Sequence, residues 1–112
     1  MSLEDSAYYH HIYDAIEHIH VYTKDMSFLD FARDTKTIDA CVHQLQIIGE
    51  AANQMSSDGR STLPAIPWPD VISMRNHIVH EYFGVDIDTV WTTIVEDLPI
   101  LEKHMLEIIK KL

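Results

Sequence analysis

The sequence predicts an all-α fold: an antiparallel, up-and-down four-helix bundle whose last helix is kinked. Residues that break helices are rare, because the chain of 112 residues has only 3 glycines and 4 prolines. Apolar residues recur at three- and four-residue steps over several long segments, and no segment sustains alternation between apolar and polar side chains. The length is that of one domain with its own core, so residues 1–112 are expected to form a single bundle.

Two long helices are expected in the first half of the chain. The first runs from about Leu3 to Tyr22 and repeats apolar residues along one face, namely Tyr8, Ile12, Ala15, Ile16, Ile19 and Tyr22. A connection over residues 23–34, with a short helical turn from Ser27, leads to a second helix from about Thr35 to Ser56. Its expected core positions are Ile38, Cys41, Leu45, Ile48 and Ala52. Residues 57–61 are interpreted as a stop followed by a loop.

The second half predicts two further helices. Pro69 suits the first turn of a third helix, where its missing N–H costs nothing, and this helix is expected to reach about Phe83. Asp86 or Asp88 can cap the fourth helix. Pro99 lies inside that helix and is expected to kink or restart it.

Composition excludes several classes of protein. The single cysteine cannot form an internal disulfide, and no apolar run is long enough to span a membrane, so a cytoplasmic protein is expected. The formal charge of −10 argues against a surface that grips long nucleic acid, because phosphate contacts need Lys and Arg. A small local basic site remains open.

Residues 74–83 bring an arginine, two histidines, an asparagine and a tyrosine together on one short segment. On a helical wheel of about 100° per residue, one wedge of about 160° holds Arg75, Asn76, His80 and Tyr82. Arg binds phosphate oxygens as a fork, and His transfers protons near neutral pH. From the residues alone, a structural or surface role for the Arg75–His80 pair stays open, because such pairs occur often by chance.

Other candidates favour structure over chemistry. His11, Asp14 and His18 share one helix face, but we recognise no second ligand helix and no Glu-x-x-His pair, so no metal site and no cofactor are predicted. Cys41 is expected in the core. Gly49 is expected to permit close helix approach, with Glu50 in a structural hydrogen bond.

The pattern Arg75-Asn76-x-x-x-His80-x-Tyr82 resembles the signature of the HEPN superfamily, in particular its HepT-like toxin branch. The resemblance extends from about Leu3 to Leu112. Its further blocks are Ile47-Ile48-Gly49-Glu50-Ala51-Ala52, Ile66-Pro67-Trp68, Val90-Trp91 and Leu98-Pro99-x-Leu101.

This resemblance implies a homodimer of helical bundles in which two Arg-x4-His motifs face each other across a cleft. Arg75, its dimer mate and a nearby Arg60 are then expected to make a small positive pocket, and contact with the active cleft is a second possible role for Glu50. It implies the toxin of a toxin–antitoxin pair, acting as a metal-independent endoribonuclease on an RNA such as tRNA or mRNA. Arg75 and His80 take the catalytic roles, with Asn76 in support. Tyr82 corresponds to the tyrosine to which a minimal nucleotidyltransferase antitoxin adds AMP.

The residue types fit this chemistry. Without a metal, RNA is cleaved by its own 2′-hydroxyl, which needs a base, an acid and a cation near the phosphate.

Two alternatives to a ribonuclease remain: a non-catalytic substrate-binding subunit of a two-component nucleotidyltransferase, and a dimeric structural protein without a ligand.

Overall fold

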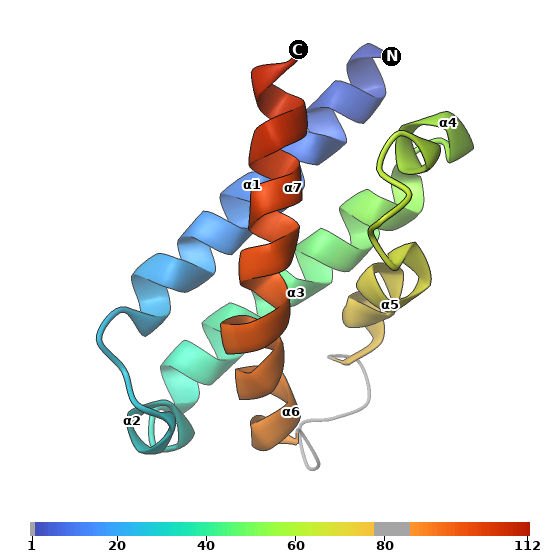
Figure 1. Ribbon diagram of the computed structural model, residues 1–112. Coiled ribbons are helices and arrows are strands. Elements are labelled where there is room, and N and C mark those ends of the chain that lie inside the picture. The colour runs from blue at the N-terminus through green and yellow to red at the C-terminus, as the bar shows by residue number, and fades with distance from the viewer. Residues whose placement is uncertain (1, 78–85) are drawn as a thin grey trace.

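The computed structural model describes residues 2–77 and 86–112, and within these ranges the chain is all-α. Helices α1 (Leu3–Thr23) and α3 (Thr35–Gln54) lie side by side and antiparallel (Figure 1). Each starts at a side-chain cap, since Ser2 accepts from the backbone N–H of Asp5 and Asp34 accepts from that of Thr37, both at 3.0 Å.

The apolar faces expected for these two helices form the core, except that a different tyrosine of α1 is buried. All five positions predicted for α3 are buried. On α1, Tyr9 is fully buried, whereas Tyr8 is half-buried and Tyr22 is exposed. The Tyr9 hydroxyl donates to the carbonyl of Gly59 at 2.6 Å, so a long-range partner decides which of the two adjacent tyrosines points inward.

Short elements connect the long helices. Helix α2 (Phe28–Ala32) forms at the expected turn, with a capping box between Ser27 and Asp30. The stop expected at residues 57–61 is instead one short helix, α4 (Ser57–Ser61). Ser56 starts this turn by accepting from the N–H of Gly59 at 3.0 Å, a capping signal that the sequence reading missed.

The last helix is kinked, as expected, through a widened turn. Asp86 caps α6 (Ile87–Thr92), a π-helical turn η2 (Thr93–Asp97) follows, and α7 (Leu98–Lys110) completes the chain. Pro99 has no N–H and its ring would clash with a carbonyl one turn earlier in a regular helix. The N–H of Leu98 donates to the carbonyl of Thr93 instead, which carries the helix past the proline.

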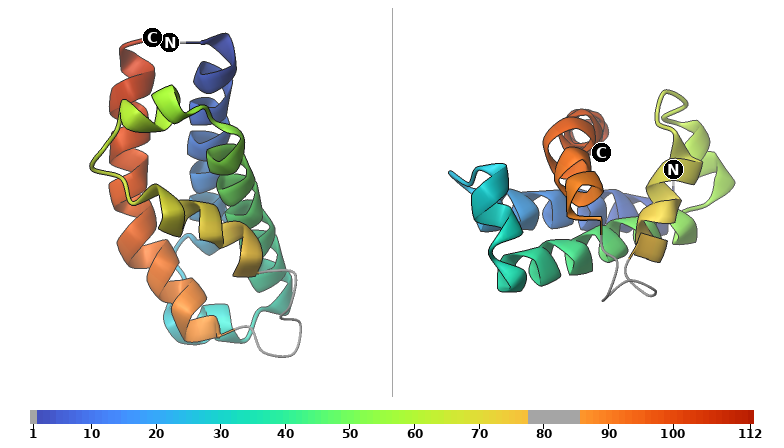
Figure 2. Two further views of the ribbon diagram at one scale, coloured as in Figure 1. Left: turned by 90° about the vertical axis from the view of Figure 1, so that its right-hand side faces the viewer. Right: turned by 90° about the horizontal axis from the view of Figure 1, so that it is seen from below.

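The remaining element is α5 (Trp68–Ser73), which continues as a 3₁₀ helix η1 (Met74–His77). The expected third helix is therefore α-helical over a shorter range, and residues 78–83 of its predicted length lie outside the described ones. Figure 2 shows α7 on the α1–α3 pair and both chain ends at one end of the molecule. The four-helix up-and-down arrangement and the dimer stay predictions.

The described helices include none that combines the length and apolar character needed to cross a membrane.

Candidate active site

Gly49 brings the segment that carries Arg75 against the middle of α3. A Cβ atom on Gly49 would lie 2.4 Å from the backbone nitrogen of Arg75 and 2.9 Å from the carbonyl oxygen of Ile72. Both atoms belong to the backbone and cannot rotate away, so no other residue fits without moving η1. The expected role of Gly49 in close approach is confirmed.

The side chain of Arg75 points to the residue next to that glycine. Its Nη1 lies 3.6 Å from Oε1 of Glu50, and the two side chains are 33% and 50% exposed. At this distance the contact is an ion pair rather than a hydrogen bond, and water screens it. Glu50 thus holds the guanidinium near the surface, which leaves it accessible to an anion from solvent.

The helical wheel drawn from the sequence does not apply unchanged to this segment. Arg75 and Asn76 lie on a 3₁₀ turn, which advances about 120° per residue rather than about 100°. The N–H of Met74 donates to the carbonyl of Val71 and so tightens the end of α5. His80 and Tyr82 lie outside the described residues, so their place in the wedge stays a prediction.

A hollow of about 410 Å³ opens on the neighbouring surface between α1 and α3. Glu50 belongs both to this hollow and to the ion pair with Arg75. The rings of Tyr8 and His11 meet edge to face here, with centroids 6.0 Å apart. The other lining residues are His43, Gln46, Ile47, Ala51 and Gln54. The wall therefore combines aromatic rings, imidazoles and amides, which are groups that stack on bases or hydrogen-bond to them.

Arg60 contacts the end of a helix. Its Nη1 donates to the carbonyls of Ala52 and Met55 at 3.2 and 3.0 Å. Those carbonyls belong to the C-terminal end of α3, where the helix leaves acceptors unpaired and a cation is favourable. The structure thus gives Arg60 a helix-capping role, and a positive pocket shared by Arg60, Arg75 and its dimer mate stays a prediction.

The three α1 residues considered as metal ligands do not converge. His11 contacts Tyr8, while Nδ1 of His18 lies 3.3 Å from Oε1 of Gln44. All three are exposed, which fits the expected solvated face.

Cys41 is a core residue. Burial raises the pKa of its thiol to about 12, and the charge of Asp34 adds to the shift. A thiol with so high a pKa is unreactive near neutral pH.

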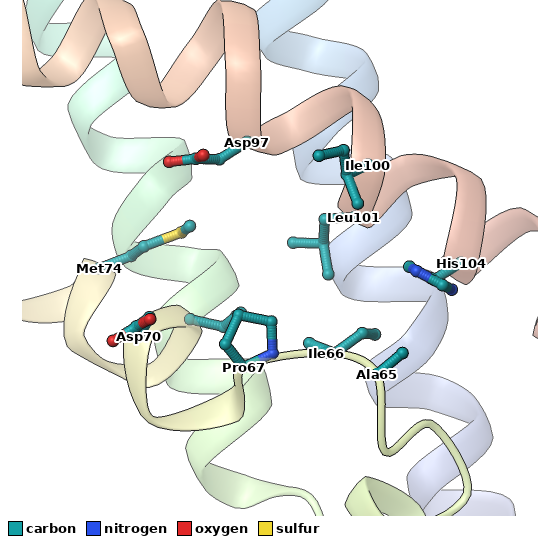
Figure 3. A pocket seen from close by; sticks show the side chains of 10 residues that line it. Ala65, Ile66, Pro67, Asp70, Met74, Asp97, Ile100, Leu101 and His104 are labelled. Carbon is teal, nitrogen blue, oxygen red and sulfur yellow. The ribbon is translucent and has the colours of Figure 1, made fainter.

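A second hollow, of about 210 Å³, lies between α5 and α7 (Figure 3). Its walls are mostly apolar, with Ile66, Met74 and Leu101 among them, while Asp70, Asp97 and His104 contribute polar atoms. Met74 is the first residue of η1 and immediately precedes Arg75, so this hollow adjoins the start of η1.

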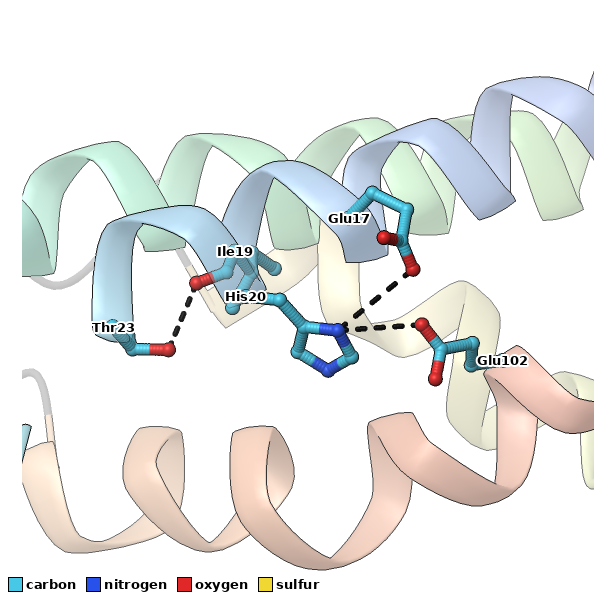
Figure 4. A network of polar contacts seen from close by, with 5 residues as sticks. All are labelled: Glu17, Ile19, His20, Thr23 and Glu102. Carbon is cyan, nitrogen blue, oxygen red and sulfur yellow. Dashed lines mark hydrogen bonds and ion pairs between the residues drawn. The ribbon is translucent and has the colours of Figure 1, made fainter. Parts of the chain in front are cut away.

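The sequence analysis missed a polar cluster that lies between α1 and α7. Nδ1 of His20 lies 3.3 Å from Oε2 of Glu102 and 3.8 Å from Oε1 of Glu17 (Figure 4). Glu17 and His20 form a Glu-x-x-His pair, which the sequence reading failed to recognise. Spacing alone could have found these two residues, but not Glu102, which comes from α7.

The family described as Ribonuclease HepT-like matches residues 12–108 of the chain. A "Probable ribonuclease HepT" of Thermococcus cleftensis is 41% identical over 95 residues, which are 85% of this chain and 86% of that protein. A "Putative RNase" of Caldanaerobacter subterraneus subsp. tengcongensis is 38% identical over 104 residues, 93% of each chain. Another "Putative RNase", of Methanocaldococcus jannaschii, is 35% identical over 106 residues, which are 95% of this chain and 91% of that protein. No solved structure matches the chain.

Proposed function

The chain belongs to the HepT-like ribonuclease family, and from that membership we propose that it is a metal-independent endoribonuclease and the toxin of a toxin–antitoxin pair. Its relatives are named as ribonucleases. The observation that carries the proposal is the position of Arg75. A glycine-dependent contact fixes its backbone, and its guanidinium lies half-exposed next to Glu50, which also lines a surface hollow.

A cation held in this way suits a phosphodiester. The guanidinium can bind two phosphate oxygens, and its charge opposes the extra negative charge that develops on phosphorus in the transition state. Stacking groups such as Tyr8 and His11 in the neighbouring hollow suit an unpaired base. This combination favours a single-stranded segment over a duplex, in line with the chain's net charge of −10.

The reaction needs one proton removed and one supplied. His80 takes the proton from the 2′-hydroxyl, the resulting oxygen attacks phosphorus, and the bond to the 5′-oxygen breaks. That leaving oxygen takes a proton from His80 of the second protomer or from water. The products are a 2′,3′-cyclic phosphate and a 5′-hydroxyl. A homodimer supplies two histidines and two arginines to one cleft, and Asn76 orients His80 or the substrate.

Regulation would act on the same segment. A minimal nucleotidyltransferase antitoxin adds AMP to the Tyr82 hydroxyl, which places a bulky group and a negative charge beside Arg75. The phosphate of that AMP competes with RNA for the guanidinium.

The test is cleavage of purified tRNA and of a single-stranded RNA in EDTA. Tyr82 is first shown by mass spectrometry to be unmodified. Wild type should cleave and leave cyclic phosphate ends, and His80→Ala should lose about 10²–10⁴-fold in rate. His10→Ala is the matched control, because this exposed histidine contacts only the carbonyl of Ser6 among the described residues. A requirement for Mg²⁺, 3′-hydroxyl ends or full activity of His80→Ala would overturn the mechanism.

One observation favours a second candidate. The charge of −10 opposes the approach of RNA, whereas a substrate-binding subunit of a two-component nucleotidyltransferase has no such requirement. Absence of cleavage by unmodified wild type would favour this second function.

A further inference from the structure

Glu17, His20 and Glu102 converge where α1 and α7 face each other (Figure 4). One ligand atom from each residue lies within 4.8 Å of the other two. Two of the residues come from one helix at i and i+3, and the third comes from a different helix. The three ligand atoms, two from α1 and one from α7, are therefore close enough together to contact one bound ion.

The charges of this cluster are unbalanced. In the part of the chain that the structure describes, no lysine or arginine pairs with either carboxylate, and His20 is their only ion-pair partner. The two carboxylates therefore have no lysine or arginine counter-charge among the described residues.

The spacing of the ligand atoms fits a small divalent ion. Zinc binds imidazole nitrogen at about 2.0–2.1 Å and carboxylate oxygen at about 2.0–2.2 Å, which puts two ligands of a tetrahedron about 3.3–3.5 Å apart. The distance from Nδ1 of His20 to Glu102 is 3.3 Å, and that to Glu17 is 3.8 Å. A rotation of the Glu17 side chain, which is 44% exposed, would close the longer edge.

We propose that Glu17, His20 and Glu102 form a binding site for a divalent transition-metal ion of the Zn²⁺ type, which links α1 to α7. The neutral imidazole of His20 donates the Nδ1 lone pair, each carboxylate donates one oxygen, and water completes the coordination. The three side chains are partly exposed, so both the ion and the coordinating water can reach the site from solvent. The site joins α1 to α7, whereas Arg75 packs on α3, so the ion has a structural role and is distinct from the proposed cleavage chemistry.

The test uses the full chain, dialysed against EDTA and then titrated with ZnCl₂ at pH 7.5. One ion should bind per chain, with a rise in the melting temperature, because a ligand of the folded state alone stabilises it. CoCl₂ should give the visible absorption of tetrahedral Co²⁺. His20→Ala should weaken Zn²⁺ binding by more than about tenfold and abolish the rise. Glu102→Gln, which keeps the size of the side chain, should do the same.

His10→Ala on the same helix is the matched control and should bind as wild type does. Circular dichroism without metal confirms that each variant is folded. Undiminished stoichiometry and affinity in both His20→Ala and Glu102→Gln would overturn the proposal, as would the absence of any saturable binding to wild type. Neither outcome bears on ribonuclease activity in EDTA, so the two proposals succeed or fail separately.

Discussion

Gly49 and Gly59 each let another segment approach more closely than a side chain would allow, but the two contacts differ in their surroundings. A Cβ on Gly49 would meet the backbone of Arg75, and one on Gly59 would lie 2.7 Å from Cγ of Asp5. At Gly59 the partner is a buried carboxylate, which accepts from the backbone N–H and the hydroxyl of Ser56 at 2.9 and 2.6 Å. At Gly49 the partner carries a half-exposed guanidinium at 3.6 Å from its counter-ion.

The contact at Gly59 is built to stabilise the fold, whereas the contact at Gly49 leaves a charged group available for chemistry. Asp5 is itself buried and accepts short hydrogen bonds, which is how a buried charge contributes to a fold. Arg75 has one long ion pair near water, which contributes little stability but keeps the charge accessible. Substitutions at the two contacts should therefore change different quantities.

The largest expected effect is on cleavage by Arg75→Ala. Loss of the cation that opposes the transition-state charge should lower kcat/KM by about 10²–10³-fold. The free energy of unfolding should change by less than about 1 kcal/mol, because the ion pair is partly exposed. Single-turnover RNA cleavage and urea denaturation measure the two quantities. Equal loss of stability and activity would show that Arg75 supports the fold instead.

Asp5→Ala should have the opposite profile. Removal of the carboxylate takes away the acceptor of the Ser56 backbone N–H and hydroxyl and should lower the free energy of unfolding by about 2 kcal/mol. Ribonuclease activity per folded molecule should stay the same. Urea denaturation gives the first quantity, and cleavage rates well below the melting temperature give the second.

Asp5 also predicts a pH dependence. Hydrogen bonds from the side chain and the backbone of Ser56 lower the pKa of Asp5 in the folded chain. The resulting stabilisation is complete above the unfolded-state pKa of about 3.9 and is lost as the pH falls through the lower folded-state pKa. Urea denaturation from pH 6 to pH 2 should show this loss in wild type and less of it in Asp5→Asn. Parallel curves would contradict it.

Replacing each glycine with alanine compares the two contacts directly, and the expected effects on stability are no larger than that of Asp5→Ala. Gly49→Ala pushes on backbone and should lower both activity and stability, the latter by about 2 kcal/mol. Gly59→Ala pushes on the side chains of Asp5 and Met55, gains helix propensity, and should cost about 1 kcal/mol with activity intact. Full activity in Gly49→Ala would show that the position of η1 does not govern cleavage.

The smallest effect is expected for Glu50→Gln. The backbone contact at Gly49 still places Arg75, so cleavage should change less than tenfold, and stability should fall by less than about 1 kcal/mol. A loss as large as that of Arg75→Ala would instead assign the positioning of the guanidinium to the carboxylate. The same two assays distinguish these results.

Local patterns predicted the parts of the fold that depend on local physics. Helices α1 and α3, the turn at Ser27 and the cap at Asp86 follow from periodicity and capping, and all four are found. The inward position of Tyr9, the buried charge of Asp5 and the role of Arg60 depend on partners distant in sequence or on helix ends that periodicity does not mark.

The candidate site likewise has parts that the local sequence predicted and parts that depend on distant partners. The motif located Arg75, and Gly49 was expected to bring two elements together. The 3₁₀ geometry of η1, which packs closely on α3, was not foreseen, because the helical wheel assumed α-helical spacing. The Glu17–His20–Glu102 cluster needed the fold to bring α7 against α1.

The buried thiol offers a practical advantage for all these experiments. Cys41 is the only cysteine in the chain, and with a pKa of about 12 and no solvent exposure it should resist thiol reagents while the core is closed. Its labelling rate therefore reports how often the α1–α3 interface opens. A variant that loses cleavage while Cys41 stays unreactive has lost chemistry, whereas one in which Cys41 reacts readily has lost its packing.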